Sequence, residues 1–278
     1  MTLRLNACLD HLQLCSDDPR RLADFYRDIM GAETAALGPE AWACEGPERR
    51  LLIARGAPRS LGFAAYRAAS QTVLDQLGER LARAGVARLS PASPWFKAGA
   101  VALADPDGNR LEFGLPGSGG GVAGEGLPAR LQHLVLASTD AARMGRFYEE
   151  VLGFAPSDRV LDAAGDLRTV FLRSDHEHHS IGIFQAPENR LDHHCYEAGD
   201  WGLIRDWADH FAARRIPLSW GPGRHGPGNN LFIFINDCDG NWVEISAEIE
   251  RVEPDRAAGT WPHEERTLNS WGRAPLRS

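Results

Sequence analysis

The sequence predicts an α+β fold built from four β-α-β-β-β units, two in each half of the chain. Two observations predict it. The pattern of residues 9–33 returns at residues 131–156, so the chain contains a whole-domain duplication. Within each copy, strand and helix periodicities follow one another twice. The four expected units cover 9–58, 60–114, 131–186 and 190–248.

Composition limits the classes of function. The chain has 278 residues, enough for two domains, and is 43% hydrophobic and 24% charged, as in soluble globular proteins. A net charge of −8 argues against a nucleic-acid or anionic-membrane partner. The sequence has no apolar run of about 18 residues, no signal-peptide core at its start, and five scattered cysteines typical of free thiols. We therefore expect a cytoplasmic protein without a membrane partner.

The first copy illustrates the expected elements. Residues 9–14 (LDHLQL) predict a strand, and residues 16–33 predict a helix that ends at Gly31. Residues 70–85 form a second amphipathic helix pattern, and residues 95–114 form two strand patterns around a DPDGN turn.

A Gly-rich stretch separates the copies. Residues 116–130 predict a linker, and a phosphate-cradling loop is the weaker alternative, because no Lys-Ser/Thr pair follows the glycines. The chain then divides into an N-terminal domain (1–115), the linker, a C-terminal domain (131–249) and a tail (250–278). The tail either packs over the C-terminal domain or frays.

The second copy keeps the chemistry-bearing positions of the first. His133 follows His11 by 122 residues, and Glu244 follows Glu112 by 132, at the end of DCDGNWVE and DPDGNRLE respectively. Glu244 opens the second strand of a predicted hairpin, on the same face as Trp242. A carboxylate on an inward face is costly unless it is paired or bound to metal. Taken alone, such a Glu is more often an ordinary salt-bridged residue.

Six motifs in the second copy carry a resemblance: QHLVL, FYEEVLGF, DHEHHSIGIF, LDHHCYEAGDW, GPGRHGPGNN and DGNWVEISAEIE. In this order the chain resembles the vicinal oxygen chelate (glyoxalase-like) superfamily over residues 5–250, and within it the two-domain type I extradiol dioxygenases. The resemblance implies open curved mixed sheets and a homo-oligomer. It also implies ring cleavage of a small aromatic diol with O₂ at a mononuclear Fe(II), for which Mn(II) is an alternative.

By motif, the resemblance assigns the metal ligands to His133, His194 and Glu244. Two imidazoles and a carboxylate on one face of the ion leave positions for O₂ and a chelating diol. His193 is then expected to point to the opposite face. In the first copy Ala64 stands at the position of His194, so we expect the N-terminal domain to be a vestigial copy without a metal.

The resemblance also assigns two catalytic histidines: His179 as the acid–base group and His225 as a contact to a substrate hydroxyl. A solvated His-rich turn is the alternative for His179 and its neighbours. Phe234 departs from the family, which commonly has tyrosine there, and Tyr196 is the expected substitute. Phe232, Phe234 and Trp242 are the expected pocket aromatics, although each is more often an ordinary core residue than a substrate contact.

Two other functions stay open within the superfamily. A glyoxalase-like metal-dependent isomerase or lyase usually takes a fourth protein ligand from the strand near residues 180–185, where Gln185 is the only candidate. A non-enzymatic aromatic-ligand-binding protein needs no metal triad, so three ligands together with His179 and His225 disfavour it.

Overall fold

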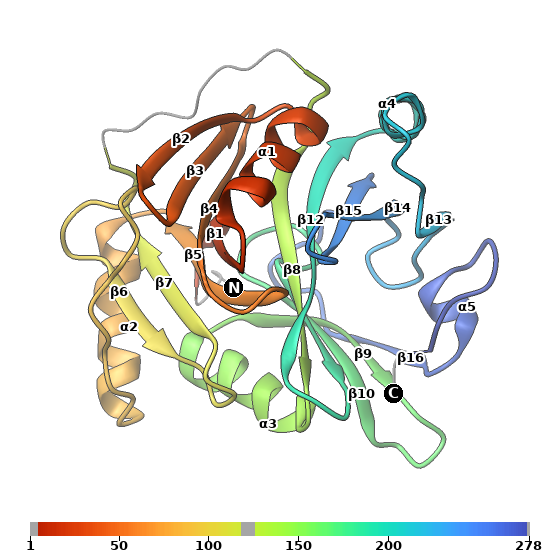
Figure 1. Cartoon of the computed structure of the whole chain (residues 1–278). Helices are drawn as coiled ribbons and strands as arrows, with labels where there is room; N and C mark the ends of the chain where they lie inside the picture. The colour runs from red at the N-terminus through yellow and green to blue at the C-terminus, as the bar shows by residue number, and fades with distance from the viewer. Residues whose placement is uncertain (1–4, 118–125, 277–278) are drawn as a thin grey trace.

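Two mixed β-sheets, one in each half of the chain, form the framework of the protein (Figure 1). The computed structural model describes residues 5–117 and 126–276. The strand order is β2-β3-β4-β1-β5-β7-β6 in the first sheet and β13-β14-β15-β12-β8-β11-β10-β9-β16 in the second. The predicted α+β class and the predicted duplication are both confirmed.

The N-terminal half follows the predicted order with one difference. Its second unit has two strands after the helix, and a single bridge, Leu89 to Ala102, stands where a third strand was expected. Pro91 and Pro94 lie in this segment, and proline cannot donate to a strand ladder. The elements are β1 (Ala7–Ser16), α1 (Pro19–Met30), β2 (Glu33–Gly38), β3 (Ala41–Gly46), β4 (Arg49–Arg55), β5 (Ser60–Ala68), α2 (Gln71–Arg83), β6 (Val101–Ala104) and β7 (Arg110–Gly114).

The C-terminal half contains two complete units and then the tail. The tail packs on the domain: its strand β16 extends the sheet beside β9, and the short helix α5 follows. The elements are β8 (Arg130–Ser138), α3 (Ala141–Arg146), the π-helical turn η1 (Phe147–Leu152), β9 (Ala155–Leu161), β10 (Leu167–Arg173), β11 (Ile181–Gln185), β12 (Arg190–Gly199), α4 (Trp201–Ala213), β13 (Trp220–Arg224), β14 (Leu231–Asn236), β15 (Trp242–Ala247), β16 (Gly259–Pro262) and α5 (Glu265–Leu268).

Each half places its first helical segment against the Asp-Gly turn of the other half. The Tyr26 hydroxyl of α1 donates to Asp237 Oδ2 at 3.2 Å, and the Tyr148 hydroxyl of η1 donates to Asp105 Oδ2 at 3.1 Å. These four side chains are buried, and Tyr26 and Tyr148 occupy equivalent positions of the duplication. The reciprocal contact fixes the two sheets relative to each other.

Residues 118–125, the centre of the predicted linker and of its phosphate-binding alternative, lie outside the described residues. In the two described segments, no helix combines the length and the apolar character that crossing a bilayer requires.

The sheet of the C-terminal half has two differently used faces. On one face, Leu134, Leu136 and Tyr196 join the large core that runs through both halves. On the other, Val135, Phe171 and Phe184 form a smaller apolar cluster, which Leu268 of the tail also contacts. The functional site lies on this second face.

Candidate metal centre

Three neighbouring strands bring two imidazoles to one carboxylate. His133 lies on β8, His193 on β12 and Glu244 on β15, and all three side chains are buried. Glu244 Oε2 lies 3.3 Å from His133 Nε2 and 3.2 Å from His193 Nε2. It has no hydrogen-bond partner in the described part of the chain. The three groups therefore converge without satisfying one another.

A neighbouring acceptor orients each imidazole. His133 Nδ1 lies 2.5 Å from Gln132 Oε1, and His193 Nδ1 lies 2.7 Å from Asp192 Oδ1. An acceptor at Nδ1 keeps the ring proton there and leaves the Nε2 lone pair toward Glu244. Metal-binding histidines typically have this second contact.

A β-bulge in each strand explains why Gln132 contacts His133 and Asp192 contacts His193. Gln132 and Asp192 each occupy a position that the pairing register skips, so each is a bulge residue. A bulge redirects a side chain that regular alternation would send to the far face. Asp10 repeats the arrangement in the first half, 2.7 Å from His11 Nδ1.

The charge of Glu244 suits a divalent cation. Burial alone would raise its pKa, but the surrounding His133, His193 and His225 imidazoles lower the pKa well below the usual range. Burial also lowers the pKa of His133, which favours loss of the Nε2 proton and so the nitrogen lone pair that a metal binds. A buried carboxylate with an unpartnered oxygen beside imidazole nitrogens is a donor set that Fe(II), Mn(II) or Zn(II) accepts. The residues present fit a metal.

Cys195 is a further candidate ligand that the sequence analysis did not name. It pairs with His133 on one side and Glu244 on the other, and the possible donor atoms of these three residues lie within 4.8 Å of one another. Burial raises the pKa of the Cys195 thiol well above its usual range, which disfavours the thiolate that a metal needs. The orienting contact favours His193 as the third ligand.

The prediction that His194 is a metal ligand is wrong. His194 points to the opposite face of β12, where its Nε2 lies 3.0 Å from the Tyr26 hydroxyl. Burial lowers its pKa to about 3, so the ring is neutral in the interface between the halves. The expectation that His193 points away was wrong for the same reason. An acceptor immediately before the histidine, as in Asp10-His11 and Gln132-His133, was the available signal.

The matching place in the first half is closed by internal contacts. Phe63, not Ala64, is the counterpart of His193, because both follow the skipped bulge position of their strands. His11 Nε2 lies 2.7 Å from Ser93 Oγ, and the Glu112 oxygens accept the backbone N–H groups of Ala92 and Ser93. Both polar groups are thus satisfied within the protein.

A cavity opens above the candidate metal centre. Its volume is about 470 Å³, including the part open to solvent, and its floor includes His133, His193 and Glu244. The walls are mainly apolar: Val135, Phe171, Phe184, Trp220, Phe234 and Leu268. Among the residues that line it there is no Lys or Arg.

The two predicted catalytic histidines line this cavity, and their catalytic role stays a prediction. The His179 ring lies 4.4 Å from the His133 ring, and burial lowers its pKa well below the usual range. His225 Nε2 lies 3.6 Å from Glu244 Oε1, while His225 Nδ1 lies 2.5 Å from the Leu268 carbonyl oxygen. Because that carbonyl can only accept, it keeps the ring proton on Nδ1.

The predicted aromatic residues have different positions. Phe234 lines the cavity. Tyr196 does not: it shares the face of His194, as expected, but that face is the core, so its proposed catalytic role is wrong. Phe232 lies behind the cavity, stacked on His225 at 4.0 Å, and Trp242 packs against Phe234 and borders a separate hollow. Neither lines the cavity, which corrects that part of the prediction.

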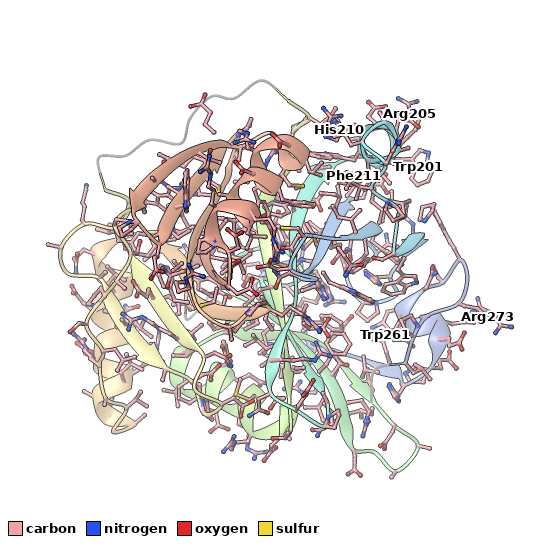
Figure 2. All side chains as sticks on the ribbon, in the orientation of Figure 1. Trp201, Arg205, His210, Phe211, Trp261 and Arg273 are labelled. Carbon is pink, nitrogen blue, oxygen red and sulfur yellow. The ribbon has the colours of Figure 1, made fainter. Side chains whose placement is uncertain are left out.

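Sequence reasoning missed the contribution of the tail. Leu268 and Thr267 line the cavity, although the tail has no counterpart in the duplication. Figure 2 shows Trp261 of the tail apart from Trp201 and Arg205 on α4, whereas Trp201 packs against Trp271 near the end of the tail, with ring centroids 5.7 Å apart. The cavity is therefore bounded on one side by a segment that no repeat pattern could predict.

The chain is similar to known proteins over most of its length. The model of the glyoxalase/bleomycin resistance protein/dioxygenase superfamily matches residues 8–113 and 130–245. Metapyrocatechase 2 of Cupriavidus necator is 28% identical over 60% of the chain, and this match spans 59% of that relative's length. Biphenyl-2,3-diol 1,2-dioxygenase of Paraburkholderia xenovorans is 30% identical over 82% of the chain and 81% of its own length.

Solved structures share the fold. Homoprotocatechuate 2,3-dioxygenase from Brevibacterium fuscum, in complex with 3,4-dihydroxyphenylacetate, superposes with a TM-score of 0.82 at 22% identity, over 98% of this chain and 91% of that one. The Mn(II)-bound glyoxalase from Novosphingobium aromaticivorans gives 0.81 at 26% identity, over 96% and 91%. The predicted fold family is confirmed.

Proposed function

This chain belongs to the glyoxalase/bleomycin resistance protein/dioxygenase superfamily, and from that premise we propose that it is an extradiol ring-cleaving dioxygenase. His133, His193 and Glu244 would hold Fe(II), or alternatively Mn(II). The observation that carries the proposal is the convergence of both Nε2 atoms on an unpartnered Glu244 oxygen at the floor of an apolar cavity. The names of the relatives support the reaction class.

The side chains around the proposed metal centre bind the diol, move protons and exclude water. The metal, when bound, supplies chelation of two vicinal oxygens and the one-electron chemistry that O₂ requires. With its proton held on Nδ1, His225 presents an Nε2 acceptor that can hydrogen-bond a diol hydroxyl and take its proton. His179, neutral and buried on the same cavity, can move a second proton during ring opening. The apolar walls exclude water from the reacting atoms.

The walls also indicate the kind of diol. A carboxylate on the substrate would lose its hydration in this cavity and would meet no Lys or Arg among the lining residues. Burying an unpaired ion costs on the order of several kcal/mol. We therefore propose an aromatic diol whose substituent is uncharged and apolar, with Phe171, Phe184 and Trp220 as its contact surface.

A glyoxalase-like isomerase is the second candidate, and the Mn(II)-bound glyoxalase neighbour favours it. Gln185, its expected fourth ligand, is occupied elsewhere. Gln185 Oε1 accepts the Ala141 N–H at 3.0 Å, and Gln185 Nε2 donates to the Thr139 carbonyl at 2.9 Å. A centre with three protein ligands suits the dioxygenase better. A homo-oligomer, implied by the family resemblance, also stays part of the proposal.

The test combines metal loading with a matched set of substrates. Protein purified without O₂ and loaded with Fe(II) is mixed with O₂ and with catechol, 3-methylcatechol, 2,3-dihydroxybiphenyl or 3,4-dihydroxyphenylacetate, and the coloured ring-opened product is followed by absorbance. We expect about one metal per chain, turnover of the apolar diols and little turnover of the carboxylated one. Metal binding without turnover of any diol would favour the isomerase, which a hemithioacetal substrate then tests. Failure to bind metal would refute the proposed centre.

A further inference from the structure

We propose that His178 and Asp158 are positioning residues that hold His179 in one tautomer, and that the C-terminal tail completes this arrangement by docking on Asp158. The consequence for catalysis rests on the proposed function. The geometry of the chain of side chains does not depend on it.

Three side chains lie in sequence behind the cavity. His179 Nδ1 lies 3.0 Å from His178 Nδ1, and His178 Nε2 lies 3.1 Å from Asp158 Oδ2. All three are buried, with exposed fractions of 3%, 0% and 1%. Of the three, only His179 lines the cavity. The other two therefore act on substrate only through His179.

The positions of the protons follow from Asp158. Its pKa would rise through burial, but His178, Trp261 and Arg256 lower it below the usual value, so the group is a carboxylate and can only accept. His178 Nε2 must then carry a proton. Arg256 Nη2 also lies 3.4 Å from Asp158 Oδ1. The two Nδ1 atoms of His178 and His179 lie 3.0 Å apart, so one of them must donate and the other accept, and we assign the accepting role to His178, whose proton is held at Nε2.

The tautomer of His179 is the result. Because His178 Nδ1 accepts, His179 Nδ1 must donate, so the Nδ1 proton of His179 lies on the side away from the cavity. Its Nε2 lone pair is left free to act as a base toward substrate. A histidine without these partners would exchange between two tautomers, one of which presents an N–H instead.

The tail supplies the remaining contacts of Asp158. The Trp261 indole Nε1–H donates to Asp158 Oδ2 at 2.7 Å, and the Gly259 N–H donates to Oδ1 at 3.1 Å. A Cβ at Gly259 would lie 2.4 Å from Oδ1, so only glycine allows this approach. Both residues belong to β16, whose pairing with β9 brings them beside Asp158. Figure 2 shows Trp261 where the tail meets the domain.

The tail thus orients both histidines of the cavity. Through Asp158 and His178 it holds His179, and through the Leu268 carbonyl it holds His225. Two separate points of one segment, β16 and the end of α5, make these contacts. The proposed proton positions of His179 and His225 therefore both depend on the docking of the tail.

The first experiment reads the tautomers directly. Two-dimensional ¹H–¹⁵N spectra of imidazole-labelled, metal-free wild-type protein identify which nitrogen of each histidine is protonated. We expect opposite tautomers in adjacent residues: His178 protonated at Nε2 and His179 at Nδ1. The same tautomer in both, or exchange between tautomers at His179, would overturn the proposal. This measurement needs neither turnover nor a variant, so it is independent of the proposed reaction.

The second experiment changes the carboxylate without changing its size. In Asp158→Asn no orientation of the amide can accept from the Trp261 and Gly259 N–H groups and from His178 Nε2 together, so the contact that fixes the proton of His178 is weakened. We expect exchange between the two tautomers at His179, a kcat lower by about 10- to 100-fold, and KM and bound metal within about 3-fold of wild type. Asp158→Glu, which keeps a carboxylate, should recover part of the kcat. Asp166→Asn is the matched control, because it makes the same substitution at an exposed carboxylate just after β9, the strand that contains Asp158. Equal kcat and unchanged tautomers in Asp158→Asn and the control would refute the role of Asp158.

Discussion

The hydroxyl of Tyr26 lies 3.0 Å from Nε2 of His194, across the boundary between the two halves of the protein. Tyr26 donates its single proton to Asp237, so its oxygen accepts from the imidazole N–H. His194 thus serves the contact between the halves, while its neighbour His193 faces the cavity. Two adjacent histidines have opposite tasks.

Separate alanine substitutions of His193 and His194 distinguish metal binding from the contact between the halves. We expect His193→Ala to lose bound metal and turnover, because one of three ligands is removed. His194→Ala should keep the metal but lower the free energy of unfolding by about 2–4 kcal/mol, through a buried void and a lost hydrogen bond. Metal analysis and urea denaturation measure the two effects. Loss of metal in folded His194→Ala, with metal retained in His193→Ala, would contradict the assignment.

Substitution of Cys195 tests whether Cys195 or His193 is the third metal ligand. We expect Cys195→Ala to keep about one metal per chain, because the buried thiol stays protonated and His193 completes the ligand set. Metal content after Fe(II) loading, compared with His193→Ala, measures this. If Cys195→Ala loses the metal while His193→Ala retains it, the ligands are His133, Cys195 and Glu244.

The contact between the halves can be tested at its two equivalent tyrosines. Tyr26→Phe and Tyr148→Phe each leave a buried Asp oxygen without its hydroxyl donor. We expect each to lower the free energy of unfolding by about 1–3 kcal/mol, with nearly additive effects in the double variant. Urea denaturation followed by fluorescence and by circular dichroism measures the loss. Coincident transitions would show that the halves unfold together, and a Tyr26→Phe variant as stable as wild type would contradict the role of this contact.

Asp237 makes stability depend on pH. Burial raises its pKa from 3.8 to about 6. Because the folded state binds the proton more tightly than the unfolded chain, this group favours folding below pH 4, and that contribution is lost as pH rises to about 6. A shift of about two units corresponds to roughly 2–3 kcal/mol. Asp237→Asn should remove this slope between pH 4 and 6, while the exposed Asp166→Asn should keep it. An unchanged slope in Asp237→Asn would contradict the assignment.

Phe234 offers a test of the cavity itself. Phe234→Tyr adds a hydroxyl to a ring that lines the cavity. The centroid of the Phe234 ring lies 5.2 Å from that of the His193 ring. We expect kcat/KM for apolar diols to rise by up to about 5-fold, as one added hydrogen bond of about 1 kcal/mol allows. Phe234→Leu, which adds no donor, is the control. A fall in both variants would indicate that the cavity needs the phenyl ring for packing.

Much of this architecture could be predicted because the duplication is visible in the sequence. The paired positions of His11 and His133, and of Glu112 and Glu244, located two of the three proposed ligands on their strands. The third proposed ligand was missed by one residue, because the bulge at Asp192 decides which of two adjacent histidines faces the cavity. Strand alternation cannot reveal a bulge. The tail, which contacts His225 through the Leu268 carbonyl and Asp158 through Trp261, has no repeated counterpart to compare.

The first half also shows why His11 and Glu112 persist in a copy that lacks the third imidazole. Both are buried, and their polar atoms are bonded to Asp10, Ser93 and the backbone of the loop above them. Replacing either would leave a buried partner without its hydrogen bond, at a cost of about 1–3 kcal/mol. Stability alone is thus a sufficient physical reason for both residues in the first half. The matching residues of the two halves share a position on their strands but have different surroundings.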